Sequence, residues 1–400
     1  MKYEQFALGT CVKVAGGYAF KSNDLSDEGI PIVRISDLRN GELVLDKVAR
    51  IPESKVGKGR SYQIEPGDIL MAMSGATTGK IGLAPNDLTG VVLQNQRVGN
   101  FKTTDNSKIV KCYLRHYLTS PNYLSQVWNT VVGVAQPNIS SKQLESFKIP
   151  LPPLSEQKRI AEILDRAEAL RAKRRVALAL LDELTQSIFL DMFGDPVSNP
   201  KGWEWGKLKD VLVLITYGLT VRPKYVPDGI PLISGKEIRS GIVDYENAAK
   251  ISQKDFDALS QKAKPTKHDL LFSKTGSIGH TAIIESDLPF ALAQNVARLT
   301  FAPTLVNHTY ALFYLRSRSI QSLAKRSVRG NAVKDLQLGV MGDFPFALPP
   351  LQLQLEFAQR IDALQILRKV CEKANFNCDQ LFTSLQHRAF RGQLSSRCLE

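Results

Sequence analysis

The 400-residue chain contains one arrangement twice, and this internal repeat constrains its fold more than any other feature. The string LPPL occurs at residues 151–154 and again at 348–351, and both copies precede a long helical pattern. The segments before them also match, since GIPIVRISDLRNG at 29–41 corresponds to GIPLISGKEIRSG at 229–241. A repeat this long indicates duplicated domains rather than a solenoid of short units.

Two further pairs of strings extend the repeat through the globular parts. GDILMAMSGATTGKIG at 67–82 corresponds to HDLLFSKTGSIGHTA at 268–282, with one residue deleted. LQNQR at 93–97 corresponds to AQNVA at 293–297, which pairs Gln94 and Asn95 with Gln294 and Asn295. Short apolar stretches alternate with Gly, Pro and Asn, which predicts a mixed α/β or mostly β unit.

Each LPPL string introduces a coiled-coil pattern that a narrow apolar stripe defines. The predicted stripes are Ile160, Ile163, Ala167, Leu170, Arg174, Ala177, Leu181, Leu184 and Ile188, and Phe357, Arg360, Leu364, Leu367, Cys371, Ala374, Cys378, Leu381 and Leu385. Proline pairs mark both starts, whereas Gly194 and Gly392 mark the ends. A narrow stripe needs a partner stripe, and the nearest partner is the other helix of the same chain.

Charge and composition favour a polyanionic partner. Lys and Arg number 52 against 39 Asp and Glu, which gives a net charge of +13 and a pI of about 9.4. A basic soluble protein without such a partner is the alternative. No apolar run approaches the roughly 20 residues of a membrane span, and the five cysteines form no CxxC pair. We therefore expect a cytoplasmic protein without disulfides, metal or membrane contact.

The stretch MSGATTGKIG at 73–82 is similar to a phosphate-binding loop, but its spacing excludes a P-loop. Three residues separate Gly75 from Gly79 where that motif needs four, and Ile81 follows Lys80 where a Ser or Thr would bind magnesium. The chain also has no Asn-Pro-Pro-Tyr string, no G-x-G-x-x-G, no zinc spacing and no nuclease-like carboxylate cluster. We predict no catalytic residue, no metal ligand and no cofactor.

The string LPPLSEQKRIAEILD at 151–165, with FGDP at 193–196, GDIL at 67–70 and QPNIS at 136–140, resembles the specificity (S) subunit of type I restriction–modification systems. The second half departs from it, with LPPLQLQLEFAQRID and GNAVKDL in the corresponding places. The resemblance implies a non-catalytic subunit whose two target recognition domains each read half of a bipartite site in double-stranded DNA. It also implies partners: two methyltransferase subunits docked on the helices, and restriction subunits that join them. S-adenosylmethionine and ATP would be bound by these partners.

The resemblance implies an α+β fold with two similar mixed α/β domains separated by two long helices that form an antiparallel coiled coil. The expected segments are an N-terminal target recognition domain at 1–150, a central helix at 151–196, a C-terminal target recognition domain at 197–347 and a C-terminal helix at 348–395.

Candidate DNA-binding residues are polar and basic side chains in the paired loops. In the first domain they are Arg34, Ser36, Arg39, Ser74, Thr77, Thr78, Lys80, Gln94, Asn95, Arg97, Gln136 and Asn138. In the second they are Ser234, Lys236, Arg239, Lys274, Thr275, Ser277, His280, Gln294, Asn295, Lys325, Arg326, Arg329, Asn331 and Lys334. Such side chains and glycine-rich backbone suit phosphates and base edges. The alternatives are turns that need positive φ at glycine, amides that satisfy backbone groups at a strand edge, and solvated loops.

Two other functions remain open at this point. A protein-interaction scaffold would carry two binding domains on a helical strut and show no preference for DNA. A DNA-processing enzyme would show activity in the isolated chain once nucleotide or metal is added.

Overall fold

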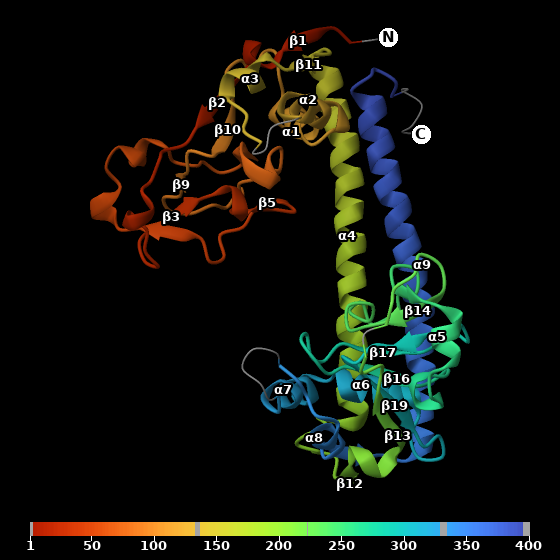
Figure 1. Cartoon of the computed structure of the whole chain (residues 1–400). Coiled ribbons are helices and arrows are strands. Elements are labelled where there is room, and N and C mark those ends of the chain that lie inside the picture. Colours follow the sequence, from red (N-terminus) through yellow and green to blue (C-terminus); the bar gives the residue numbers. More distant parts are fainter. Residues whose placement is uncertain (1–2, 133–136, 222, 329–333, 395–400) are drawn as a thin grey trace. The chain divides into compact units, whose positions relative to one another are not determined.

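The computed structural model of the chain describes residues 3–132, 137–221, 223–328 and 334–394 (Figure 1). Contacts divide the chain into two compact units: unit 1 is Met1–Arg175 with Lys373–Glu400, and unit 2 is Val176–Glu372. Each unit combines one globular part with half of each long helix. The four segments expected from the sequence stay a prediction, because this division runs through the helices instead of along their ends.

Unit 1 is built from three sheets and three short α-helices within the described residues. A two-stranded sheet joins β1 (Gln5–Ala7) to β11 (Lys148–Pro150). The main sheet has the order β2 (Val12–Gly16), β10 (Val98–Thr103), β7 (Ile69–Ala72), β8 (Ile81–Leu83), β5 (Gly41–Leu43) and β4 (Leu38–Arg39). The third sheet has the order β6 (Ala49–Ile51), β3 (Ile30–Val33) and β9 (Leu93–Gln94). The helices are α1 (Lys111–Leu118), α2 (Pro121–Val131) and α3 (Ser141–Ser146).

Unit 2 repeats this arrangement except that the main sheet lacks counterparts of β5 and β4. Its two-stranded sheet joins β12 (Glu204–Lys207) to β20 (Pro345–Leu348). The main sheet has the order β13 (Leu212–Tyr217), β19 (Val296–Phe301), β16 (Leu270–Ser273) and β17 (Thr281–Ile283). The third has the order β15 (Ala249–Ile251), β14 (Ile230–Ile233) and β18 (Ala291–Leu292). The helices are α5 (Gln253–Asp257), α6 (His308–Arg316), α7 (Arg318–Arg326) and α8 (Leu338–Gly342). Equivalent strands pair in the same order, which confirms the duplication.

One predicted correspondence between the units is wrong by two residues. In unit 1 the backbone amide of Asn95 donates to the Val33 carbonyl, and in unit 2 the backbone amide of Ala293 donates to the Ile233 carbonyl. Strand register therefore aligns Gln94-Asn95 with Leu292-Ala293, not with Gln294-Asn295. The second Gln-Asn pair lies beyond β18, in the turn before β19, and its true counterpart is Gln96-Arg97.

The two long helices are α4 (Leu154–Phe193, 40 residues) and α9 (Leu351–Ala389, 39 residues). In unit 1, Arg171 of α4 pairs with Asp379 of α9 at 2.5 Å; in unit 2, Arg368 of α9 pairs with Asp182 of α4 at 2.9 Å. These two ion pairs occupy equivalent positions of the repeat, so the helices run antiparallel within each unit (Figure 1). No helix in the described ranges, long ones included, is apolar enough to cross a membrane.

Aromatic side chains bury the helix ends in the globular cores. In unit 1, Phe390 at the end of α9 lies 5.3 Å and 5.1 Å, between ring centroids, from Tyr113 and Tyr117 of α1. In unit 2, Phe193 at the end of α4 lies 4.7 Å from Tyr310 of α6. Each core is therefore completed by the end of a long helix, which is distant in the sequence in unit 1 and directly precedes the globular part in unit 2.

The predicted apolar stripes are correct only in part. Ile160 and Phe357 are buried, and Cys371 and Cys378 are half-buried between the helices, as small apolar residues would be. Arg360 and four predicted leucines are instead exposed: Leu170, Leu184, Leu367 and Leu381. The buried positions drift to residues such as Leu164 and Phe382, because a straight α-helix with 3.6 residues per turn rotates away from a strict heptad repeat.

A buried glutamine fixes the start of each long helix. The Gln157 side chain accepts a hydrogen bond from the Val110 amide at 3.0 Å and donates to the carbonyls of Lys108 and Pro152 at 2.8 Å and 2.9 Å. Gln354 makes the equivalent three bonds to Asn307, Leu305 and Pro349. The second copy thus retains this function although it lacks the SEQ string.

We predict that Gln157→Leu destabilises unit 1 by about 2–4 kcal/mol, because one amide and two carbonyls lose their only buried partner. Chemical denaturation followed by circular dichroism measures this. Lys158→Leu, at the adjacent exposed position, is the matched control and should change stability by less than about 0.5 kcal/mol. Equal effects of the two substitutions would contradict the role given to Gln157.

Candidate nucleic-acid interface

The glycine loop of each unit is a tight turn between two paired strands. In unit 1 it connects β7 to β8, with Gly75 at φ +72° and Gly79 at φ +89°. In unit 2 it connects β16 to β17, with Gly276 at φ +78° and Gly279 at φ +105°. Glycine is required at such angles, so the turn interpretation is confirmed; it does not exclude contact with DNA. Matching hydrogen bonds also confirm the one-residue deletion and the pairing of Lys80 with His280.

Two more candidate segments of unit 1 meet at this loop. The Met73 amide donates to the Arg97 carbonyl at 2.9 Å, which ties the loop to the segment after β9. The Gly75 amide donates to the Pro137 carbonyl at 2.8 Å, and the Ile139 amide donates to the Met73 carbonyl at 2.9 Å. Segments that lie far apart in the sequence therefore form one surface.

Unit 2 builds the same junction with the same backbone bonds. The Lys274 amide donates to the Asn295 carbonyl at 2.9 Å. The Gly276 amide donates to the Lys334 carbonyl at 2.9 Å, and the Leu336 amide donates to Lys274 at 2.8 Å. The junction does not depend on side-chain identity, because the bonds link backbone atoms.

A fourth segment adjoins the glycine loop and is held by a buried carboxylate. Asp37 accepts a hydrogen bond from the Arg34 amide at 2.8 Å, and Glu237 accepts one from the Ser234 amide at 2.9 Å. Both acids are buried and shape the turn; Lys236, although exposed, also lies 3.2 Å from Glu237. We call the four converging segments of each unit the loop cluster. It comprises 34–39, 73–80, 94–97 and 137–138 in unit 1, and 234–239, 273–280, 292–295 and 334–336 in unit 2.

The candidate residues fall into three groups by exposure. Those that are exposed are Arg34, Ser36, Arg39, Lys80, Arg97, Asn138, Lys236, Arg239, Ser277, Gln294, Lys325, Arg326 and Lys334. Those that are half-buried are Thr77, Asn95, Ser234, Thr275, His280 and Asn295, and those that are buried are Ser74, Thr78, Gln94 and Lys274. Gln136, Arg329 and Asn331 lie outside the described residues.

Three of the buried candidates have structural partners, and one of them is Thr78, whose hydroxyl donates to the Gly75 carbonyl at 2.7 Å. Gln94 donates its amide to the carbonyls of Ala15 and Val98 at 2.9 Å and 2.7 Å, which agrees with the strand-edge alternative. The Lys274 ammonium lies 2.7 Å from Asp335. Although burial opposes ionisation, hydrogen bonds from Lys274 and Thr275 hold the pKa of Asp335 below its usual value. We therefore assign these side chains to the architecture of the loop cluster.

Basic groups gather on the loop cluster of unit 2. Partial burial lowers the pKa of His280, and the positive charges of Arg239 and Lys325 lower it further. His280 thus lies within the electrostatic reach of two positive charges that come from two other segments, Arg239 and Lys325 of α7. Each loop cluster also holds a buried polar atom without a partner: Thr77 Oγ1 in unit 1 and Asn295 Oδ1 in unit 2 make no hydrogen bond within the described structure. Such atoms suit a polar ligand.

The sequence prediction missed Trp128 on α2. This side chain is 46% exposed and lines the same cavity as Lys80. The signal available in the sequence was an aromatic residue on the polar side of a short amphipathic helix, next to the buried positions Tyr123 and Val127.

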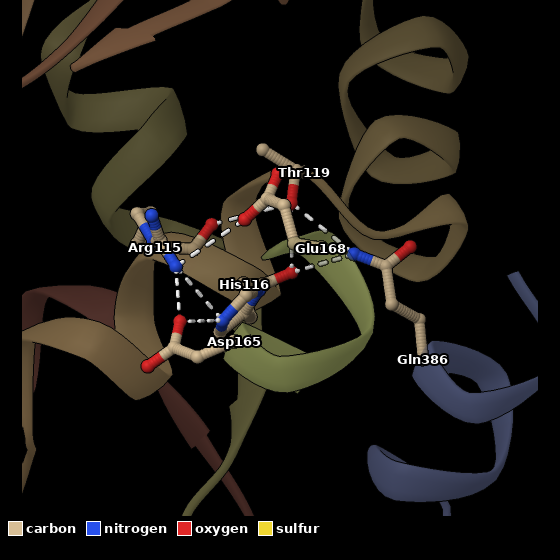
Figure 2. Close-up of polar contacts among 6 residues, drawn as sticks. All are labelled: Arg115, His116, Thr119, Asp165, Glu168 and Gln386. Atoms are coloured by element: carbon tan, nitrogen blue, oxygen red, sulfur yellow. Dashed lines mark hydrogen bonds and ion pairs between the residues drawn. The ribbon is translucent and has the colours of Figure 1, made fainter. Parts of the chain in front are cut away.

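A second polar cluster lies behind the loops of unit 1, where α1, α4 and α9 meet (Figure 2). His116 Nε2 lies 2.7 Å from Asp165 Oδ1, and Arg115 contacts both Asp165 and Glu168. His116, Asp165 and Glu168 are close enough to bind a metal ion together. The Arg115 guanidinium already supplies the positive charge between the two carboxylates, so we assign no metal to this set.

The cluster instead joins three helices. Gln386 of α9 donates to the His116 carbonyl at 3.3 Å and to Thr119 Oγ1 at 3.2 Å (Figure 2). Burial lowers the pKa of His116, and Arg115 adds to this effect against the opposing charge of Asp165. In unit 2 the equivalent position is Phe313, which packs 5.4 Å from Phe357. The same junction is therefore polar in one unit and aromatic in the other.

Comparison with known proteins places these features in a family. The chain matches the family described as type I restriction modification DNA specificity domain over residues 1–178 and 200–372. The specificity subunit of the type I restriction enzyme EcoBI from Escherichia coli is 27% identical over 427 residues, covering 98% of this chain and 86% of the relative. The EcoKI specificity subunit from Escherichia coli K12 is 22% identical over 430 residues, covering 98% and 89%.

Two solved structures share the fold at low identity. A chain from a study of complex assembly and conformational transition in the type I R-M system aligns with a TM-score of 0.63 and 19% identity, covering 98% of both chains. The type I restriction–modification S subunit from M. genitalium aligns with a TM-score of 0.53 and 14% identity, covering 98% of this chain and 96% of that one. These similarities confirm the α+β fold with its duplicated domains and long helices.

The His116 junction generates a prediction on pH. Because the folded-state pKa of His116 lies below its unfolded value of about 6.5, the folded protein binds fewer protons, and stability falls as the pH drops below about 6.5. We expect the melting temperature to fall between about pH 7.5 and about pH 5.5, and to fall at least about 2 °C less in His116→Phe, which imports the residue of unit 2. His387→Asn is the control, and an acid-induced drop that is the same in all three proteins would refute the prediction.

Proposed function

This chain belongs to the family of type I restriction modification DNA specificity domains, and we propose that it is the DNA-reading specificity subunit of a type I restriction–modification complex. Each unit reads one half of a bipartite target in double-stranded DNA. The observation that carries this proposal is the loop cluster. The same four segments converge in both units through the same backbone bonds, while their exposed side chains differ. A constant scaffold with variable side chains is what two different half-sites require.

Contacts divide between phosphates and bases. Lys80 is exposed and forms no ion pair with any described residue, so its charge is free to neutralise a phosphate. Exposed Arg and Lys side chains on the neighbouring turns, such as Arg34, Arg39, Lys236 and Arg239, suit guanine edges or phosphates. The net charge of +13 supports the same polyanionic partner.

The exposed leucines of the long helices support docking of two methyltransferase subunits. Leu170 and Leu381 flank the Arg171–Asp379 ion pair in unit 1, and Leu184 and Leu367 flank the Arg368–Asp182 ion pair in unit 2. Leu170 and Leu367 are equivalent in the repeat, as are Leu184 and Leu381. The chain thus offers two equivalent pairs of exposed leucines, which suits two copies of one partner. Restriction subunits join this complex.

We assign the chemistry to the partners. The chain recognises DNA, while methyl transfer, cleavage and ATP hydrolysis belong to the methyltransferase and restriction subunits, which bind S-adenosylmethionine and ATP. A protein-interaction scaffold without DNA preference is the rival proposal, and it lacks a reason for basic side chains to converge on both loop clusters. DNA binding that depends on sequence and on salt distinguishes the two.

Exchange of one globular part tests whether the units read separate half-sites. We predict that replacing residues 197–347 with the matching segment of a relative changes one half of the recognised motif and leaves the other half and the gap unchanged. The motif is measured by methylation of a plasmid library by the complex. Simultaneous changes in both halves would show that the units do not read independently.

We predict that Lys80→Ala weakens DNA binding to a similar extent for all sequences and lowers the slope of log K against log salt by about one, because one phosphate contact is lost. Titration of labelled duplex by the assembled complex at several salt concentrations measures both quantities. Lys158→Ala, an exposed lysine on α4 outside the loop cluster, is the control. A loss confined to one base position would mean that Lys80 reads a base instead.

A double substitution tests the docking patches. Leu184→Glu with Leu367→Glu should remove one of two bound methyltransferase subunits, because charged groups replace the apolar patch of unit 2. Light scattering of the purified complex gives the stoichiometry. Leu288→Glu is the matched control, since Leu288 is an exposed leucine of unit 2 outside the helices. Two bound subunits in the double variant would refute the assignment.

A further inference from the structure

A cavity of about 450 Å³ opens beside the glycine loop of unit 1. Leu38, Leu118 and Leu124 form apolar walls, Trp128 and Lys80 stand at its edge, and Asn40 adds a polar amide. No acidic residue lines it. The ligand that fits these walls has a flat apolar body, polar edges and a negative charge nearby.

In unit 2, side chains occupy the space equivalent to this cavity. There Arg316, which replaces Thr119, donates to the carbonyls of Gly241 and Thr281 at 2.9 Å and 2.8 Å. Gln321, which replaces Leu124, donates to the Gly279 carbonyl at 2.9 Å. These two side chains reach into the space that is open in unit 1.

The space around the equivalent glycines Gly41 and Gly241 differs between the units in the same way. A Cβ atom placed on Gly241 would lie 2.5 Å from the Arg316 guanidinium, whereas one placed on Gly41 would meet nothing within 4 Å. The difference extends to the rim, because Trp128 of α2 corresponds to Lys325 of α7. Capping serines align the two helices, since Ser120 accepts from the Tyr123 amide and Ser317 accepts from the Ile320 amide.

We propose that the cavity of unit 1 is a base-binding socket, an inference that rests on the proposed function. One base of the bound DNA leaves the stack and lies against the Trp128 ring, while Lys80 holds its phosphate. Three features favour a base over other occupants: the exposed aromatic ring suits stacking, Asn40 suits the polar edge of a base, and the basic rim suits a phosphate. The volume lies within the range of small-molecule pockets.

The consequence is an asymmetry between the half-sites. Unit 1 reads one position through an extruded base, whereas Arg316 and Gln321 leave unit 2 to read its half-site from the groove. Trp128 is therefore a specificity-determining residue of unit 1, and Lys325 acts on phosphate or base edge in unit 2.

The test uses the complex with its methyltransferase partner and a duplex that carries its selected target. 2-Aminopurine replaces one base at a time in the half-site of unit 1, and its fluorescence rises when the base leaves the stack. We expect a rise at one position on binding, loss of that rise in Trp128→Ala, and affinity about tenfold weaker. Trp205→Ala removes another exposed tryptophan, on β12 of unit 2, and should change neither quantity.

A second variant guards against an effect on folding. Leu124→Gln imports the residue that occupies the space in unit 2, so it should abolish the rise while the melting temperature stays near that of the wild type. The proposal of a socket is overturned if the fluorescence rise persists in both variants. It is also overturned if no position of the half-site shows a rise that depends on Trp128. Loss of discrimination between thymine and uracil alone also overturns it, because Trp128 would then contact a methyl group in the groove. If the wild-type complex shows no preference among duplexes, the proposed function itself fails.

Discussion

The contact of Phe390 with Tyr113 and Tyr117 joins the last turn of α9 to a globular part that lies more than two hundred residues earlier in the chain. In unit 2 the contact of Phe193 with Tyr310 joins the end of α4 to the globular part that follows it in the chain. Neither long helix has an apolar face wide enough to be stable alone, so each depends on the other helix and on these aromatic cores. That arrangement also positions the loop clusters, because α1 and α2 in unit 1, and α6 and α7 in unit 2, pack on the same cores.

In the loop cluster, backbone atoms and buried acids maintain the structure, whereas exposed side chains determine specificity. Backbone hydrogen bonds and two buried acids, Asp37 and Glu237, hold the segments together in both units. The side chains that project from them have diverged, with Lys80 in unit 1 where unit 2 has His280, and the adjoining helices α2 and α7 carry Trp128 and Lys325 at equivalent positions. Because side chains can change without loss of the backbone bonds, each unit can acquire a new half-site while the long helices keep their docking patches.

The sequence predicted those features that repeat. Two LPPL strings, the glycine loops and the matching strings at 29–41 and 229–241 identified equivalent elements, since each needs particular residues at particular backbone angles or buried positions. The predicted Gln-Asn correspondence was wrong because a short string does not reveal strand register. The register makes Asn95 equivalent to Ala293. Leu170 and Leu184 were misplaced because the heptad pattern does not follow the true helical period. Trp128 was missed since nothing in the sequence shows that Leu124 leaves space where Gln321 fills it.

Selection from a random duplex library tests the central claim most directly. The chain, assembled with its methyltransferase partner, is incubated with the library and bound duplexes are sequenced. The account predicts enrichment of two short defined blocks separated by a gap of fixed length and undefined sequence, one block for each unit. A single contiguous motif, or no enrichment at any salt concentration, would contradict the claim that two duplicated units read two halves of one DNA target.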